Sequence, residues 1–441
     1  MRLVHAALLV PLLIPTAVRG QTPASGGPSD SGAHPIRLAD AVALAQRNAP
    51  AAVQARGQME TSTAALRSAY GAFIPSFSVS ASNSQNSPVS TRTTPTGELV
   101  SGRWVASQSM SLDLDLFNGG RRFFNLSSAK ANQGAAAASE LSQRFQIAFQ
   151  VEQQFYAVLA AQESETAARA QLEQAQRQLS DAIVKVHAQT ATKSDSLRAL
   201  IQVGNAQLAL LTAQNDRATA EAALTRLVAT PYLVTASPAD TVGEGAIAVD
   251  STELAQLVEQ GPGVRQASAA LSAARAAARS ARAPYLPTLS LRFSRTRNGS
   301  SPDFTVNPDD FGYSGQLRFS LSYPIFDGFS REENVIRQDV ARENAEASLR
   351  DARLAAQETF VQSYGALRTA QQQISIQVTS VAAAEEDLRV QQQRYNLGMS
   401  TLLDVLTSQT QLNQARAALI QARFNYRVAK AQLEALIGRS L

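Results

Sequence analysis

The chain has 441 residues, of which 44% are hydrophobic but only 6% are aromatic and 17% are charged. Alanine supplies much of the apolar content, as in the run 415–422, and this is typical of long, closely packed helices rather than of a broad globule. The absence of cysteine excludes disulfides, thiolate metal sites, cysteine catalysis and a lipidated N-terminal cysteine. The 40 basic and 36 acidic residues are too evenly balanced to predict nucleic-acid binding. Three scattered histidines predict no metal site.

The N-terminus predicts export from the cytoplasm. An apolar run over 3–18 follows Arg2 and ends at small residues, which indicates a signal peptide over 1–20. A retained membrane anchor is the alternative, although two prolines interrupt the run and it is short for a bilayer span. The Pro/Gly/Ser-rich segment 21–36 is expected to be a flexible linker. Since no later run reaches the length of a membrane span, no transmembrane helix is expected in the mature chain.

An internal repeat organises the rest of the chain. The sequence Phe117-Asn118-Gly119 resembles Phe326-Asp327-Gly328, and the two phenylalanines lie 209 residues apart. Asp195 and Asp404 show the same separation. The repeat predicts three segments, namely a first structural repeat, an inter-repeat linker and a second structural repeat, over 37–229, 230–250 and 251–441.

Each repeat is expected to contain short helices, a strand pair, a long helix, a turn and a last helix. The long helices are expected over 122–186 and 331–395, where proline is absent. At about 1.5 Å per residue each would be on the order of 100 Å long. In the last helix, Val405 begins a heptad pattern of large residues with mostly alanine three positions on, which predicts a coiled-coil seam of closely packed helices.

The strand pairs are expected over 76–117 and 288–326. Residues such as Tyr313, Leu317 and Phe319 alternate with polar ones, so each strand has one apolar and one polar face. This period of two is typical of outer-membrane barrel strands, while a two-layer sheet covered by helices is the alternative. Four strands are too few to enclose a channel, so a barrel would have to be shared among chains. The predicted fold class is mainly α, with long antiparallel coiled-coil helices and a membrane β-barrel portion.

The segment Arg394–Leu406, RYNLGMSTLLDVL, together with the duplicated turns after the strands, resembles the TolC family of outer-membrane efflux proteins over nearly the whole mature length. The resemblance implies a homotrimer in which each chain gives four strands to one outer-membrane barrel and its long helices to a periplasmic α-barrel. It also implies partners, namely an inner-membrane transporter, a periplasmic adaptor protein and the lipid of the outer membrane. No enzyme activity, metal or other cofactor is implied.

The resemblance assigns roles to residues near the two helix turns. Asp404 matches an acidic gate and selectivity position at the tunnel entrance, while Tyr395 and Asp195 match a latch. Three such carboxylates around a narrow axis would disfavour anions and resist simultaneous ionisation. The alternatives are that Asp404 is solvated in the first turn of its helix and that Tyr395 simply packs between helices. The turn residues Leu397, Gly398 and Met399 match the adaptor contact, with an ordinary helix C-cap at the glycine as the alternative.

Three positions depart from the family pattern. Thr407 stands where a second acidic ring is expected, so one carboxylate ring is predicted. Ser400 replaces the basic latch residue, and Gln189 replaces the glycine of the first turn. A charged latch is therefore in doubt, whereas a hydrogen bond between Tyr395 and Asp195 could survive.

Charged residues also occur in the expected strands. The period of two places four of them on the polar face, which would line the lumen: Asp113, Asp115, Arg292 and Arg318. Arg295 and Arg297 are expected to follow the third strand at its outer end, where they would meet lipid phosphates or form ordinary solvated surface. The alternative function is a non-conducting periplasmic adaptor or scaffold, which the amphipathic strands disfavour. The absence of a P-loop predicts no nucleotide hydrolysis, and the exported substrate is not predicted.

Overall fold

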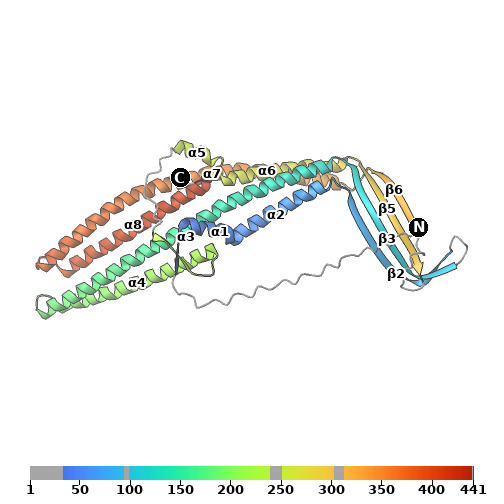
Figure 1. Ribbon diagram of the computed structural model, residues 1–441. Coiled ribbons are helices and arrows are strands. Elements are labelled where there is room, and N and C mark those ends of the chain that lie inside the picture. The colour runs from blue at the N-terminus through green and yellow to red at the C-terminus, as the bar shows by residue number, and fades with distance from the viewer. Residues whose placement is uncertain (1–32, 94–98, 239–250, 302–311, 440) are drawn as a thin grey trace, which may run out of the picture.

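A computed structural model of the protein describes residues 33–93, 99–238, 251–301, 312–439 and 441. The molecule is elongated, with a four-stranded sheet at one end and long helices that extend away from it (Figure 1). The predicted signal peptide over 1–20 and most of the expected linker lie outside the described residues. Among the helices that the structure describes, none is both long and apolar enough to cross a membrane.

Two helix pairs form the long part of the molecule. The helices α3 (Arg121–His187) and α7 (Ser330–Asn396) have 67 residues each, and α4 (Lys193–Val228) and α8 (Leu402–Ile437) have 36 each. At about 1.5 Å per residue, the longer helices reach about 100 Å. All four helices begin and end 209 residues from their counterparts, so the predicted repeat and both long helices are confirmed.

The expected heptad seam is buried on α8. Val405, Leu412, Tyr426 and Leu433 are each at most 3% exposed, and Ala422 and Ala429 are buried beside them. In the first repeat the equivalent small residues of α4 are buried as well, at Ala199, Ala206 and Ala213. Alanines at these positions let the helices approach closely, because a methyl group occupies little of the space between two helix axes. The seam therefore produces a thin wall of paired helices.

Shorter helices connect these pairs to the sheet. In the first repeat they are α1 (Leu38–Asn48) and α2 (Pro50–Gly71), and in the second α5 (Ser251–Val258) and α6 (Pro262–Ser280), followed by the 3₁₀ turn η2 (Ala283–Tyr285). Proline is the first residue of both α2 and α6, where its missing N–H leaves no helical hydrogen bond unmade. Both helices run beside α3 toward the sheet (Figure 1).

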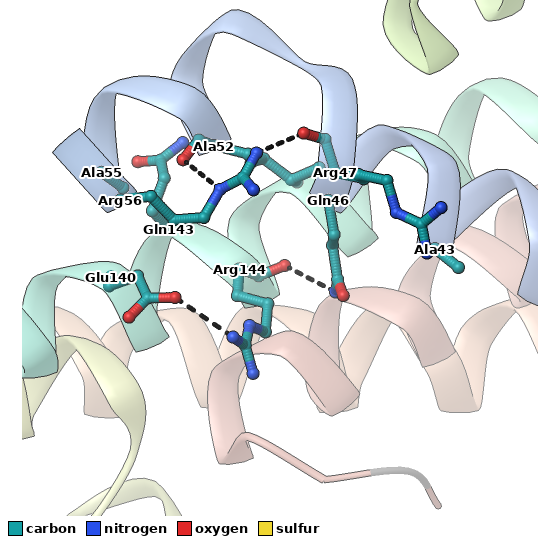
Figure 2. A pocket seen from close by; sticks show the side chains of 10 residues that line it. Ala43, Gln46, Arg47, Ala52, Ala55, Arg56, Glu140, Gln143 and Arg144 are labelled. Atoms are coloured by element: carbon teal, nitrogen blue, oxygen red, sulfur yellow. Dashed lines mark hydrogen bonds and ion pairs between the residues drawn. The ribbon is translucent and has the colours of Figure 1, made fainter.

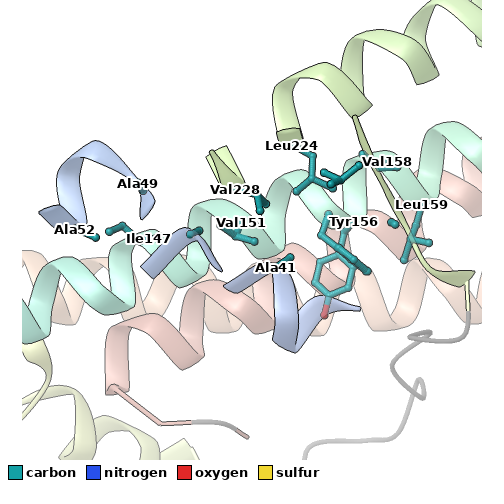
Figure 3. Close-up of a cluster of buried hydrophobic side chains, with 14 residues drawn as sticks. Ala41, Ala49, Ala52, Ile147, Val151, Tyr156, Val158, Leu159, Leu224 and Val228 are labelled. Atoms are coloured by element: carbon teal, nitrogen blue, oxygen red, sulfur yellow. The ribbon is translucent and has the colours of Figure 1, made fainter. Parts of the chain in front are cut away.

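The largest core cluster lies midway along the molecule, where α1, α3 and α4 meet (Figure 3). The side chains of Val151, Phe155, Val158 and Leu224 are fully buried there. Burial of a large apolar side chain stabilises a fold by about 1.5–3 kcal/mol. This cluster packs α3 against α1 and α4 near the middle of α3.

The strands form one antiparallel sheet in the order β2 (Ser76–Thr93), β3 (Leu99–Asn118), β5 (Thr288–Ser301) and β6 (Gly312–Ser322). The two predicted hairpins are thus confirmed, and β3 joins β5 so that both repeats share one sheet. β6 ends four residues before the predicted limit at Phe326. Pro324 explains the difference, since proline has no N–H for a strand ladder.

The two segments predicted to be linkers contain a short parallel strand pair, so this part of the prediction was wrong. β1 (His34–Ile36) pairs with β4 (Val234–Ala236), within segments predicted to be irregular. β4 is anchored because Thr235 Oγ1 donates a hydrogen bond of 2.6 Å to Glu221 on α4, while Gln162 on α3 donates one of 2.8 Å to the same hydroxyl. Strands of three residues are too short to show a period in the sequence. The remainder of the inter-repeat linker, 239–250, lies outside the described residues.

Candidate functional site

The turns between the paired helices lie at the end of the molecule opposite the sheet (Figure 1). At the α7–α8 turn, Gly398 donates to the carbonyl of Tyr395 and Met399 donates to that of Arg394, at 3.1 and 2.8 Å. This is a Schellman motif, in which the residue after the helix takes positive φ, and Gly398 has φ +73°. Leu397 and Met399 flank the glycine and are 73% and 66% exposed.

The α3–α4 turn has the same backbone with different side chains. Gln189 donates to Val186 and Thr190 donates to Lys185, at 3.0 and 2.9 Å. Gln189 therefore occupies the left-handed region with φ 59°, which is less favourable by about 1–2 kcal/mol for a residue with a Cβ atom. Its neighbours are Ala188 and Thr190, so this turn lacks large apolar side chains.

Asp404 and Asp195 both cap the helices that follow the turns. The carboxylate of Asp404 accepts hydrogen bonds of 2.8 Å from the N–H and the hydroxyl of Thr401, whose own Oγ1 accepts from the N–H of Asp404. Asp195 makes the same capping box with Thr192. The hydrogen bond from the backbone of Thr401, followed by that from its hydroxyl, lowers the pKa of Asp404 below its usual value. Asp404 is thus an exposed, ionised residue in the first turn of α8.

The expected hydrogen bond between Tyr395 and Asp195 is not formed. The Tyr395 hydroxyl is buried and makes no hydrogen bond to the residues that the structure describes. Thr192 donates two hydrogen bonds to Oδ2 of Asp195 instead. Burial, then the negative charges of Asp195 and Asp181, raise the pKa of Tyr395. Tyr395 packs with Leu402 and Ala199, which are residues of different helix pairs.

Lys185 makes a polar contact between the two helix pairs near the turns. Its Nζ lies 3.8 Å from the centre of the Tyr395 ring and donates a hydrogen bond of 3.1 Å to Asn396 Oδ1. A cation over an aromatic face is stabilising by about 0.5–1 kcal/mol at an exposed site. Lys185 was not predicted from the sequence, although two of the four lysines, Lys185 and Lys193, flank this turn. Ser400, which stands at the family's basic position, donates instead to the carbonyl of Gln391 at 3.3 Å.

A cleft of about 390 Å³ lies beside this link, between α3 and the α7–α8 pair. Its wall includes Tyr395, Asn396, Gln178 and Asp181. Both ends of the Gln178 side-chain amide are buried without a hydrogen-bond partner among the described residues. The wall of this cleft is therefore polar and incompletely paired among the described residues, whereas the coiled-coil seam farther along α8 is apolar.

The four predicted strand charges share one face of the sheet. The register aligns Asp113, Arg292 and Arg318 in one row, and Asp115 lies two residues along on the same side. Arg292 Nε lies 2.5 Å from Asp113 Oδ1. The opposite face carries apolar rows such as Phe77, Leu112, Phe293 and Leu317. The sheet thus has the predicted apolar face and polar face.

A second cleft, of about 240 Å³, lies where α1 and α2 meet α3 (Figure 2). Arg56 on α2 donates a hydrogen bond to the backbone carbonyl of Arg47 on α1, and Gln46 on α1 donates one of 3.4 Å to the backbone carbonyl of Arg144 on α3. These contacts join α1 to both of its neighbours, while the ion pair of 3.1 Å between Arg144 and Glu140 lies within α3. Within the described ranges, no three His, Asp or Glu side chains gather into a group that could bind a metal.

The duplicated helix pairs and the shared sheet agree with comparisons to known proteins. The sequence profile described as outer membrane efflux protein matches residues 40–230 and 254–439, one match to each repeat. The chain belongs to the outer membrane efflux protein family. Its members are transport channels of the outer membrane, and the resemblance to the TolC family is confirmed.

Individual relatives match parts of the chain. Alkaline protease secretion protein AprF of Pseudomonas aeruginosa is 29% identical over 172 residues, and outer membrane protein TolC of Escherichia coli is 25% identical over 178. These alignments span 36–37% of this chain and 34–35% of the relatives, so the chain covers about a third of their length.

Solved structures match over nearly the whole fold. A membrane protein from Pseudomonas aeruginosa has a TM-score of 0.77 at 18% identity and is covered over 97% of both chains. The outer membrane protein VceC of Vibrio cholerae has a TM-score of 0.73 at 17% identity, with 91% of this chain and 96% of that chain covered. The open MtrE channel of Neisseria gonorrhoeae gives 0.74 at 19%, with 92% and 89% covered. These likenesses show the fold, namely a mainly helical chain with a few strands.

Proposed function

We propose that this protein is the outer-membrane channel of a tripartite efflux or type I secretion system. It would pass substrates from an inner-membrane transporter and a periplasmic adaptor across the periplasm and the outer membrane. The observation that carries the proposal is the amphipathic four-stranded sheet at the end of paired helices about 100 Å long. Membership of the outer membrane efflux protein family supports it.

The open edges of the sheet support a homotrimer. The outermost strands β2 and β6 each have one neighbour in the sheet, and a strand edge cannot remain unpaired inside a bilayer. A barrel of about eight strands, as two chains would give, is filled by side chains, while larger barrels enclose a channel. Three chains would supply twelve strands, and the row containing Asp113, Arg292 and Arg318 would then line a lumen of mixed charge.

The turns would form the periplasmic entrance. Three copies of Asp404 around the axis would attract cations and disfavour anions. Tyr395 and Lys185 would hold neighbouring helix pairs together, with Asp195 acting through the charge that it presents to the tyrosine ring rather than through a direct hydrogen bond. The exposed apolar residues Leu397 and Met399, on either side of Gly398, would contact the adaptor.

Recording of the purified protein in planar bilayers tests the proposal. Discrete conductance steps are expected, with a preference for cations. A non-conducting periplasmic adaptor or scaffold would bind partners but give no steps, so a silent bilayer with correctly folded protein would reject the channel. The chain itself would perform no catalysis, and transport would be driven by the inner-membrane partner. Co-purification from crosslinked envelopes would identify that partner and so the class of exported substrate.

A further inference from the structure

Charged side chains lie among apolar neighbours at two places in the structure. On the sheet, Arg295 and Arg297, which were expected after the third strand, lie within β5 on the apolar face. On the helices, Glu152 of α3 follows the fully buried Val151 and faces α8. The second place joins the two repeats, because α3 belongs to the first repeat and α8 to the second.

Two contacts define how α3 and α8 pack against each other. At the end of α8, a Cβ atom on Gly438 would meet the ring of Phe145 at 3.5 Å. Farther along, the guanidinium carbon of Arg427 lies 5.8 Å from the centre of the Tyr156 ring. The residue number falls on α8 as it rises on α3, so the two helices are antiparallel. Glu152 therefore lies opposite the part of α8 between these two contacts.

Lys430 and Glu434, one helical turn apart, are the charged residues of α8 that act on Glu152. Lys430 Nζ lies 3.9 Å from Glu434 Oε1, which also accepts a hydrogen bond of 2.8 Å from the backbone N–H of Leu441. Glu152 itself makes no hydrogen bond or ion pair with the residues that the structure describes. One lysine thus lies near two carboxylates and contacts only one of them.

The other helices packed on this part of α3 present apolar side chains. α1 and α4 contribute residues such as Ala41 and Leu224 to the core cluster that contains Val151. Burial, followed by the negative charge of Glu434, raises the pKa of Glu152 to about 7, although the charge of Lys430 opposes this change. Glu152 therefore changes its charge in the neutral range.

We propose that Glu152, Glu434 and Lys430 form a proton-sensitive contact that controls how tightly the two repeats pack. With Glu152 protonated, the contact contains one carboxylate and one lysine, and α3 packs against α8. Ionisation of Glu152 places a second carboxylate beside the first one, and the contact loosens. Each helix pair is held along its own seam, so the two pairs would then separate at the turns. The inference rests on the proposed channel and adds regulation of its entrance by pH.

The direction of the pH effect follows from the raised pKa of Glu152. When the contact opens, water reaches the carboxyl group and its pKa returns toward the ordinary value of 4.5. The closed contact keeps its proton over a range in which the open contact has lost it, so the stability of the closed contact falls as the pH rises from 4.5 to about 7. The equivalent position of the second repeat is Val361, so this carboxyl group occurs in the first repeat alone.

Hydrogen exchange of residues 145–159 in the full-length protein tests the contact. After correction for the pH dependence of the intrinsic rate, exchange in the wild type should become about tenfold faster or more between about pH 5.5 and about pH 8. E152Q, which resembles the neutral carboxyl group, should exchange slowly at both pH values. The matched control E173Q changes an exposed glutamate of α3 and should behave like the wild type. E434Q should move the midpoint downward in pH and K430Q should move it upward, because Glu434 raises the pKa of Glu152 and Lys430 lowers it.

Two exchange results would overturn the inference, namely a wild type whose exchange does not respond to pH and an E152Q variant that responds as the wild type does. The open probability of the same proteins in planar bilayers separates this test from the proposed function. The wild type should open more often at the higher pH, whereas E152Q should not respond. Channels that conduct with the same pH response in both proteins would reject the regulation alone. Silence of the folded wild type would reject the channel, and with it the regulation of an entrance.

Discussion

The turn between α3 and α4 and the turn between α7 and α8 have the same hydrogen bonds but different surfaces. Both are Schellman motifs followed by a Thr–Asp capping box. The second turn exposes Leu397 and Met399 around a glycine, whereas the first exposes Ala188 and Thr190 around Gln189. Duplication thus preserved the backbone, which the helix reversal requires, while the side chains diverged. The proposed adaptor contact is therefore assigned to the second turn.

The largest expected effect is loss of the adaptor contact at the second turn. Replacement of Leu397 and Met399 by serine should weaken binding of the adaptor recovered from crosslinked envelopes by about 2 kcal/mol, or roughly thirtyfold, because two large apolar side chains would no longer be buried. Biolayer interferometry with the purified partners measures the change. The matched variant A188S, at the first turn, should bind like the wild type. Equal losses of adaptor binding in both variants would contradict the proposal that the adaptor contacts mainly the second turn.

Removal of the charge of Asp404 should reduce the cation preference of the open channel. D404N keeps the side-chain size and a capping acceptor but removes three charges from the entrance of a trimer, so the cation-to-anion permeability ratio should fall about threefold or more at low salt, where screening is weakest. The reversal potential under a salt gradient measures the ratio. D195N is the control at the other turn. An unchanged reversal potential in D404N would exclude Asp404 from selectivity.

The capping box should set the pH at which that selectivity is lost. The hydrogen bonds from Thr401 lower the pKa of Asp404, so they favour the ionised form, and their contribution to stability is present above the unfolded pKa and lost as the pH falls through the folded pKa. T401A removes the hydroxyl donor but keeps the backbone one, so the midpoint of selectivity loss should move upward in pH. T192A should leave this midpoint unchanged. A downward movement in T401A would contradict the assigned role of the cap.

Substitutions at the left-handed position of each turn should have smaller effects on turn stability, of opposite sign in the two repeats. G398A places a Cβ at φ +73° and should destabilise the second turn by about 1 kcal/mol, while Q189G should stabilise the first turn by a similar amount. Hydrogen exchange of the turn amides measures both. No difference between G398A and the wild type would mean that this turn is not held in the left-handed conformation.

Much of the architecture was predictable because its elements produce repeating sequence patterns. The separation of 209 residues, the heptad from Val405 and the alternation around Tyr313 each repeat often enough to identify an element, and the structure confirms the helices and hairpins that they predict. The pairing of β1 with β4 was not predictable, since two strands of three residues lie about 200 residues apart. The predicted end of β6 at Phe326 was wrong because Pro324, which has no N–H for the strand ladder, follows the last strand residue by two positions.

The candidate site was predicted less completely than the fold. Asp404 and Asp195 lie in helix first turns as the repeat requires, but the sequence showed only their position and not that the capping threonines engage both carboxylates. The contact of Lys185 with Tyr395 depends on how one helix pair lies against the other. A contact between the two repeats produces no repeating sequence pattern. The basic residues at the equivalent positions 185 and 394 were the available sequence indication of it.

The central claim, a barrel shared among chains, is tested most directly by engineered disulfides between β2 and β6. The chain has no cysteine, so a cysteine at Ser80 can be combined with one at Ser314, Gln316 or Ser320 without background. Oxidation of the full-length protein in membranes, followed by denaturing electrophoresis, reports which edges meet. The account predicts covalent trimers for at least one pair. Disulfide-linked monomers from all oxidised pairs would show that β2 and β6 of one chain close on each other and would contradict the shared barrel.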